Sequence, residues 1–218
     1  MVCRIADLPL LKIKTKNMTL AQFCTEFENQ NAIILLEGKR TVIEKDKEKL
    51  IQLGQILAQK LPLATFRSGN ADGADFYFSQ GVLAVAPERL QVITPYTNHR
   101  QKQNNAYKTI SLDEINLVKE EAVVYQSKNN KKTKSLIDKY VGGAKDRFSI
   151  KAAYIIRDTV KVTGTNSGVA PTTFAFFYDD EQNPKTGGTG HTMAICDLNK
   201  IPYLTQDVWM EWVADLEN

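Results

Sequence analysis

A run of very small residues is the first place in this sequence where chemistry is expected. The stretch is TFRSGNADGADFYF, residues 65–78, and it separates an apolar run from a predicted helix. Glycine lets a backbone approach a phosphate closely, and the start of a helix offers free N–H groups. We interpret the stretch as a turn that cradles a ligand. The residues expected to contact that ligand are Arg67, Ser68, Gly69, Ala71, Gly73 and Asp75. The alternative is a tight turn that only lets a helix pack closely.

A second glycine-rich turn repeats this design. It opens the helical part of PKTGGTGHTMAICDLNKIPYL and consists of Gly187, Gly188, Thr189, Gly190 and His191. A third turn follows the first apolar run and consists of Gly38, Lys39 and Arg40. Together the turns predict an anion pocket formed by Lys39, Arg40, Arg67, Ser68 and Thr189. Neither a Walker A loop nor a G-x-G-x-x-G motif is present.

Two side chains are candidates for catalysis. His191 follows a glycine turn, where an imidazole contacts phosphate or acts as a general acid; the alternative is local hydrogen bonding at a helix start. Asp75 is predicted in the first turn of a helix. It either caps backbone donors or accepts a hydrogen bond from a sugar hydroxyl.

Other charged residues are predicted at the same edge. Arg100 comes soon after a predicted strand, and its side chain is a candidate for contact with a phosphate group. Arg157 beside Asp158 is either a ligand contact or half of a structural salt bridge. Asp179 and Asp180 end an apolar strand, where we expect either a polar strand end or a sugar contact, with Mg²⁺ as a further candidate ligand.

The elements that would position these residues alternate along the chain. Apolar runs at 32–36, 63–67 and 91–95 are separated by helical patterns at 44–60 and 72–83. Further runs at 172–178 and 201–204 flank a helical pattern at 190–199. This rhythm predicts an α/β, Rossmann-like, mostly parallel sheet with helices on both faces and a helical insertion. In such sheets ligands bind beyond the carboxyl ends of the strands.

The chain is predicted to form a single domain over residues 1–218. Residues 1–30 are a helical extension with a Thr19–Gln22 capping box. Residues 100–150 are a helical insertion, in which Ser111 and Glu114 are read as a second capping box. The run KNNKKTK within it is typical of a solvated loop. Residues 205–218 are a terminal helix whose tryptophans are expected to pack in the core or between subunits.

Composition sets limits on the class of protein. A chain of 218 residues with 43% hydrophobic and 24% charged residues is typical of a globular protein. No apolar run reaches the roughly 20 residues of a membrane helix. MVCRIADLPLLKIKTK does not resemble a signal peptide, and three scattered cysteines predict a reducing cytoplasm. A net charge of +3 is weak for nucleic acid, which we therefore do not expect as a partner.

The three turns together resemble the SLOG superfamily, the Rossmann-like group of the Lonely Guy enzymes, the DNA-processing protein A group and many bacterial and phage proteins. The resemblance rests on GKR, on RSGNADGAD, and on GGTGHT followed by IP. IRDTVKVTGT, residues 156–165, also resembles a segment that precedes the penultimate strand in a subset of these proteins. The match spreads over about residues 32–204.

The resemblance implies a nucleotide pocket at the carboxyl edge of the sheet, lined by residues such as Arg67, Asp75 and Arg157. Lonely Guy enzymes carry P-G-G-x-G-T-x-x-E, whose glutamate serves phosphoribohydrolase chemistry. Here the stretch is TGGTGHTMAI, without a glutamate. The resemblance therefore does not extend to that cleavage mechanism.

Three functions follow as expectations. The first is a sensor, carrier or sequestering protein that binds a nucleotide-derived phosphate ligand and forms a homo-oligomer. The alternative is an enzyme of the glycosidase or phosphohydrolase type acting on such a ligand. The second alternative is a nucleic-acid-binding module that uses the lysines of KNNKKTK.

Overall fold

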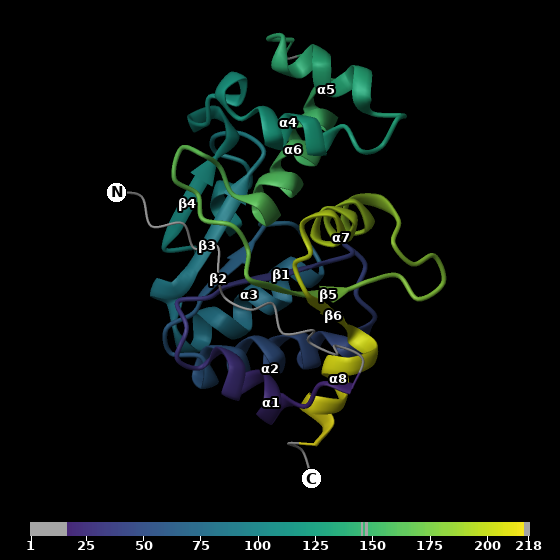
Figure 1. Cartoon of the computed structure of the whole chain (residues 1–218). Helices are drawn as coiled ribbons and strands as arrows, with labels where there is room; N and C mark the ends of the chain where they lie inside the picture. Colours follow the sequence, from purple (N-terminus) through teal and green to yellow (C-terminus); the bar gives the residue numbers. More distant parts are fainter. Residues whose placement is uncertain (1–16, 145, 147, 216–218) are drawn as a thin grey trace.

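The fold is built on one parallel sheet. A computed structural model describes residues 17–144, 146 and 148–215. Six strands pair in the order β4-β3-β2-β1-β5-β6, and every pairing is parallel (Figure 1). The strands are β1 Ile33–Gly38, β2 Thr65–Ser68, β3 Leu90–Thr94, β4 Lys108–Ser111, β5 Phe174–Tyr178 and β6 Tyr203–Thr205. The predicted α/β, Rossmann-like class is confirmed.

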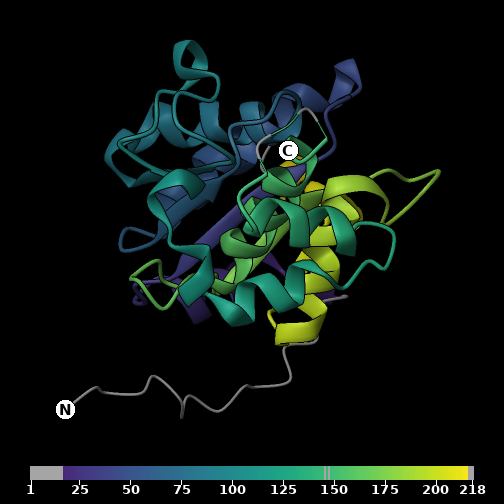
Figure 2. The same cartoon turned by 90° about the horizontal axis from the view of Figure 1, so that it is seen from above.

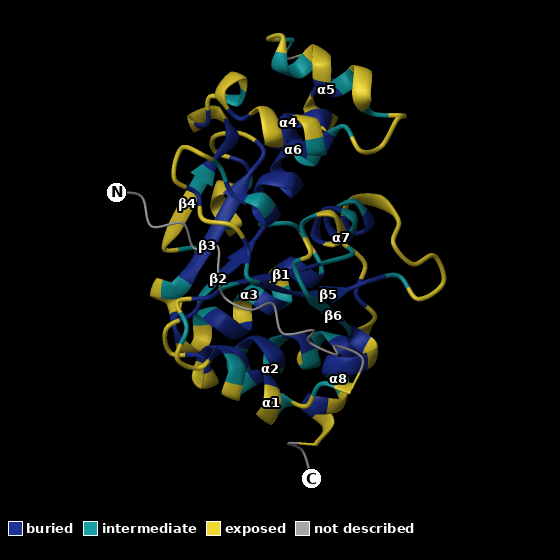
Figure 3. Cartoon of the chain, viewed as in Figure 1, coloured by how far each residue is buried: buried dark blue, intermediate teal, exposed yellow. Residues whose placement is uncertain are grey.

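Four helices cover one face of the sheet: α1 Leu20–Phe27, α2 Glu44–Lys60, α3 Ala74–Val85 and α8 Gln206–Ala214. Side chains alternate across a strand, so neighbouring residues of β1 serve opposite faces. Ile34 and Leu36 join the core beneath these helices, whereas Leu35 belongs to the core of the other face. Because both faces are covered, the central strands are buried throughout (Figure 3) and read in the sequence as continuous apolar runs.

The other face is covered by α6 Ile150–Thr163 and α7 Gly187–Asn199. Two further helices, α4 Glu121–Ser127 and α5 Lys134–Val141, pack on α6 and share its apolar cluster. In Figure 2, viewed from above, this group of helices lies in front of the sheet. The group supplies one wall of the cavity described below.

The span 100–150 differs from its prediction. It contains β4, which pairs with β3, so part of it belongs to the sheet. Ser111 ends that strand, and its Oγ accepts a hydrogen bond from the N–H of Asp113 to cap a single 3₁₀ turn. The predicted α-helix starting at Ser111 is therefore wrong, and the first α-helix of the span is α4. The division of the chain into a domain with an insertion stays a prediction.

The two ends of the described chain pack together. The capping box at Thr19 is confirmed: its Oγ1 accepts from Gln22 N, and its N–H donates to Gln22 Oε1. Trp209 is fully buried and donates to the carbonyl of Phe177, while Trp212 donates to the carbonyl of Met18. Both tryptophans belong to the core beneath α8.

Several expectations fall outside the described residues. The reading of residues 1–16 as no signal peptide, the first half of the predicted extension, and residues 216–218 of the predicted terminal helix lie there. Within the described part, no helix is both long and apolar enough to span a bilayer.

Candidate functional site

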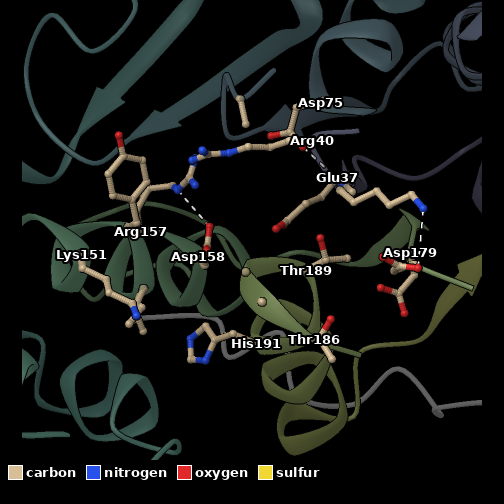
Figure 4. Close-up of a pocket in the computed structure, with 18 of the residues that line it drawn as sticks. Glu37, Arg40, Asp75, Lys151, Arg157, Asp158, Asp179, Thr186, Thr189 and His191 are labelled. Atoms are coloured by element: carbon tan, nitrogen blue, oxygen red, sulfur yellow. Dashed lines mark hydrogen bonds and ion pairs between the residues drawn. The ribbon is translucent and has the colours of Figure 1, made fainter. Parts of the chain in front are cut away.

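The chain reverses its direction of travel across the sheet between β1 and β5. From β1 it proceeds through β2 and β3 to β4 on one side, and β5 and β6 lie on the other. Gly38 at the end of β1 pairs with Tyr178 at the end of β5. Beyond these two strand ends lies a cavity of about 790 Å³ (Figure 4). This is the topological switch point, where ligands of open α/β sheets bind, and its volume is in the range of small-molecule sites.

Six parts of the chain line the cavity. The turn after β1, the turn after β5, the start of α7 and one side of α6 form its floor and walls. The segment from the turn after β2 to the start of α3 adds Ala71 and Asp75, and the α4–α5 loop adds Asn130 and Thr133. Eleven of the predicted ligand-binding residues are among the lining: Gly38, Lys39, Arg40, Ala71, Asp75, Arg157, Asp179, Gly187, Gly188, Thr189 and His191.

Six predicted residues do not line it: Arg67, Ser68, Gly69, Gly73, Arg100 and Gly190. Arg67 and Ser68 are fully buried within β2. Arg67 donates through Nε to Gln91 Oε1 at 2.8 Å and through Nη1 to the carbonyl of Lys161 at 2.8 Å. Burial lowers the pKa of this guanidinium to about 10. Arg67 therefore stabilises the interior beneath the site and is not a wall of the pocket.

The other four are held by neighbours. Gly73 has φ +80°, and a Cβ there would overlap the backbone of Arg40, so this glycine is required by the turn. Gly190 packs against the backbone of Lys185, and Arg157 covers Gly69. Arg100 forms an ion pair with Asp72. The packing interpretation of the small residues thus applies to part of both glycine turns.

Asp75 joins two turns. Its Oδ1 accepts from the N–H of Gly38 at 3.2 Å, and its Oδ2 accepts from the N–H of Gly69 at 3.0 Å. The residue is 1% exposed. Of its two predicted binding roles, the structure shows the capping of backbone donors, and this fixes the first two strand-end turns relative to each other.

A cluster of buried charges forms the floor of the pocket. Lys161 Nζ lies 2.7 Å from Glu37 Oε2 and 2.9 Å from Asp158 Oδ1. Arg157 Nε lies 2.9 Å from the same Asp158 oxygen. The other oxygen of Glu37, Oε1, accepts from Thr192 Oγ1 at 2.9 Å. Lys161 is fully buried, so the two carboxyl groups that share it are held next to each other below the cavity.

The environments of these two carboxyl groups separate their pKa values. Burial raises the pKa of Glu37 to about 7, although Lys161 opposes the shift. Burial also acts on Asp158, but Arg157 and Lys161 outweigh it and hold the pKa of Asp158 below its ordinary value. Asp158 is therefore an anion at neutral pH, while Glu37 titrates there.

Glu37 and Lys161 are functional candidates that sequence reasoning missed. Glu37 directly follows the apolar run 32–36, and Lys161 lies within IRDTVKVTGT, but neither is among the candidates predicted from the sequence. The signal was available in both cases, because a single charge within an apolar run is rarely buried without a partner. Of the two alternatives for Arg157, the structure shows the ion pair with Asp158. Both residues also line the cavity, and the contact of Arg157 with a ligand stays a prediction.

His191 is held by hydroxyl groups. Its Nε2 lies 3.1 Å from Thr159 Oγ1, and Ser127 Oγ donates to that hydroxyl at 2.9 Å. Burial lowers the pKa of His191, so the ring is neutral at pH 7. The hydrogen bond to Thr159 is the local bonding that was the alternative for His191. The phosphate contact and the general-acid role stay predictions.

Arg40 and Arg157 create a positive field on one side of the cavity. Both act on His99, whose pKa is lowered to about 4, by burial first and then by Arg157, Arg100 and Arg40. Arg40 is exposed, and its side chain pairs with no other residue that the structure describes. The predicted basic residues near the turn after β1 thus retain one guanidinium available to a ligand.

The carboxylates after β5 contact the protein itself. Asp179 Oδ2 accepts from the N–H of Lys185 at 2.7 Å, and Asp180 Oδ1 accepts from the N–H of Gln182 at 3.0 Å. Asp180 also lies 3.8 Å from Lys39 Nζ. In the described part of the chain, no group of three or more His, Cys, Asp or Glu side chains is arranged to hold a metal ion.

Comparison with known proteins yields a likeness of fold. No protein-family model matches the sequence, and no curated protein matches it. A solved structure of DNA processing protein A from Helicobacter pylori, described for its unique single-stranded DNA binding mode, is similar, with 12% sequence identity and a TM-score of 0.49. The likeness covers 83% of this chain and 67% of that chain.

This comparison corrects one expectation. We did not expect nucleic acid as a partner, because the net charge is small. That expectation is wrong, since the solved structure to which the chain is similar belongs to a protein that binds single-stranded DNA. Net charge averages over the whole surface and says nothing of where the lysines gather.

Proposed function

We propose that the cavity binds a nucleotide or a nucleotide-derived phosphate ligand, and that the protein serves as its sensor, carrier or sequestering protein. The observation that carries the proposal is the convergence of Arg40 and Arg157 on one wall of the switch-point cavity. Figure 4 shows the two side chains extending toward one another from different elements. Paired guanidinium groups suit the planar, multidentate recognition of a phosphate.

The charge balance of this wall supports an anion. Of the three arginines that act on His99, Arg100 pairs with Asp72 and Arg157 with Asp158. Arg40 has no such counter-charge among the described residues. A bound phosphate would supply it. After burial, which is the largest cause, Arg157, Arg100 and Arg40 all lower the pKa of His99, as expected of a positive region.

The start of α7 gives further support. Gly187 and Gly188 open this helix and line the cavity, and the first N–H groups of a helix have no partner within it. A Cβ at Gly187 would meet no atom within 4 Å, so the turn is open. The resemblance to the SLOG superfamily supports the same conclusion, because it implies a nucleotide at this edge.

Replacing Arg40 with alanine is expected to weaken nucleotide binding about tenfold, or about 1.4 kcal/mol, through the loss of a charge-assisted hydrogen bond. Titration calorimetry with a panel of nucleotides would measure the change. Lys60→Ala is the matched control, since Lys60 is an exposed cation at the far end of α2 and its loss should leave binding unchanged.

The ligand itself is sought by native mass spectrometry of the gently purified protein, before and after denaturation. A co-purifying phosphate compound would identify its class, and its intact or cleaved state would distinguish binding from turnover. If nothing co-purifies, and no nucleotide up to millimolar concentration shifts the mass or the melting temperature, the proposed function is wrong.

A second candidate function is the binding of single-stranded nucleic acid. The loop between α4 and α5 reaches the cavity through Asn130 and Thr133. The same loop carries the exposed Lys131 and Lys132, and Lys151 lines the cavity as well. Exposed lysines on segments that line a phosphate pocket suit a chain of phosphates longer than one nucleotide.

For this candidate, the double change Lys131→Ala and Lys132→Ala is expected to reduce the slope of log affinity against log salt by about 1–2 for a single-stranded oligonucleotide. Fluorescence anisotropy over a salt series would measure the slope. Mononucleotide affinity serves as the internal control and should not change. An unchanged slope, or no binding of oligonucleotides at low salt, would count against nucleic acid.

A further inference from the structure

One oxygen of Asp158 is left open to the cavity. Its Oδ1 is fixed by Arg157 Nε and Lys161 Nζ, each at 2.9 Å. Its Oδ2 accepts a hydrogen bond from none of the residues that the structure describes, although Asp158 is only 4% exposed. Oδ2 is also the one atom that a Cβ on Gly188 would approach within 4 Å, at 3.4 Å. The oxygen therefore faces the glycine turn at the start of α7.

The neighbouring carboxylates on the floor differ in this respect. Asp75 has both oxygens bonded to backbone N–H groups. Glu37 has one oxygen beside Lys161 and the other bonded to Thr192. Asp158 thus combines a fixed side chain, deep burial and an acceptor without a partner. Oδ2 faces the open cavity and not the packed interior, so a ligand donor there would gain a charge-assisted hydrogen bond.

We propose that Asp158 Oδ2 accepts a hydrogen bond from a sugar hydroxyl of the ligand, which makes Asp158 a specificity-determining residue of the phosphate pocket. The inference rests on the proposed function. It assigns the ligand two ends: a phosphate beside Arg40 and Arg157, and a hydroxyl-bearing sugar beside Asp158. Figure 4 shows Asp158 between Arg157 and the first residues of α7.

The surroundings favour a neutral donor over an ammonium group. Two cations, Arg157 and Lys161, already contact Asp158. The positive end of the α7 dipole lies at Gly188, on the other side of Oδ2. These positive charges would repel a third cation, whereas a hydroxyl brings a donor without a charge. The same cations keep Asp158 ionised, so it can only accept.

The test compares ligands that differ by one hydroxyl. The four ribonucleoside 5′-monophosphates are titrated by calorimetry, each with its 2′-deoxy and 3′-deoxy counterparts. A hydrogen bond to a charged, buried acceptor predicts that loss of the recognised hydroxyl weakens binding about 10- to 100-fold. Equal affinities across each set would overturn the inference.

Two substitutions at one position provide the protein side of the test. Gly188 does not have a positive φ, and a Cβ there meets Asp158 Oδ2 at an ordinary contact distance, so side chains are tolerated. Gly188→Ser brings a hydroxyl of the protein next to Oδ2 and is expected to reduce the discrimination between ribose and deoxyribose to less than about 3-fold. Gly188→Ala adds similar bulk without the hydroxyl. Because Gly188 lines the cavity, this variant measures the effect of bulk alone, and the serine variant is expected to discriminate less than the alanine variant.

The possible outcomes distinguish failure of the role of Asp158 from failure of nucleotide binding. If the serine and alanine variants discriminate equally, Asp158 does not read the hydroxyl, and the inference fails while nucleotide binding stands. If no nucleotide binds the native protein, the proposed function fails and the inference falls with it. Circular dichroism and melting temperature confirm that both variants are folded before the affinities are compared.

Discussion

Replacing Lys161 with methionine is expected to lower the free energy of unfolding by about 3–5 kcal/mol at neutral pH. Methionine matches the length of the lysine chain but removes the ammonium group that Glu37 and Asp158 share at 2.7 and 2.9 Å. Both carboxyl groups would remain buried, at 4% exposure each. Urea unfolding followed by the fluorescence of the buried tryptophans would measure the loss.

The control for this prediction removes a second charge. In the double variant Lys161→Met and Glu37→Gln, the amide cannot ionise, so part of the lost stability should return at pH values above the pKa of Glu37. Asp158 keeps its contact with Arg157 in both variants. A loss below about 1 kcal/mol in the single variant would mean that water or a rearranged partner solvates the cluster, contrary to the prediction.

The second large effect is a dependence of stability on pH. The folded-state pKa of Glu37 is about 7 against an ordinary value of 4.5, because the carboxyl group is buried. The folded state therefore holds this proton more tightly than the unfolded state does. The resulting stability is fully present below pH 4.5 and is lost as pH rises through 7. At 1.36 kcal/mol per pKa unit the loss is about 3 kcal/mol.

Glu37→Gln isolates this contribution from the other titrating groups. Urea unfolding of both proteins at several pH values between 4.5 and 8 gives the difference in free energy at each pH. The difference should change steadily over this window, with the native protein losing stability relative to the variant as pH rises. His99 and His191 are present in both proteins and cancel. Parallel curves would show that Glu37 does not titrate in this range.

The central part of the fold was predictable because its strands are buried on both faces. Such strands are continuous apolar runs, and the helices between them carry apolar residues at helical spacing. The edge strand β4 has neither property, since only four residues form it and Lys108 and Thr109 are exposed. Its place in the sheet comes from pairing with β3, which local sequence does not reveal.

The site was predictable where the backbone dictated the residue type. A turn that needs a positive φ, or that permits close approach, selects glycine, and the turns around Gly38 and Gly187 do line the pocket. The direction of a side chain at a strand end was not predictable in this way. Arg67 precedes its turn directly but points into the interior, where Gln91 holds it.

The cluster of buried charges on the floor of the pocket could not be predicted from local sequence patterns. Glu37, Lys161 and Thr192 come from β1, α6 and α7, and only the folded chain brings them together. A buried charge in the sequence signals that a partner exists without identifying it. The open acceptor on Asp158 depends on which of its two oxygens the cations occupy, which is a matter of three-dimensional geometry.

The two margins of the sheet determine how this molecule can associate with others. An exposed strand edge recruits further strands, and short length, lysine and proline are the usual protections against this. On one margin, β4 begins at the exposed Lys108. On the other, β6 has three residues and directly follows Pro202. Pairing of strands between two copies of the chain is thus disfavoured at both edges of the sheet. We therefore expect the predicted homo-oligomer to form through contacts between surface helices.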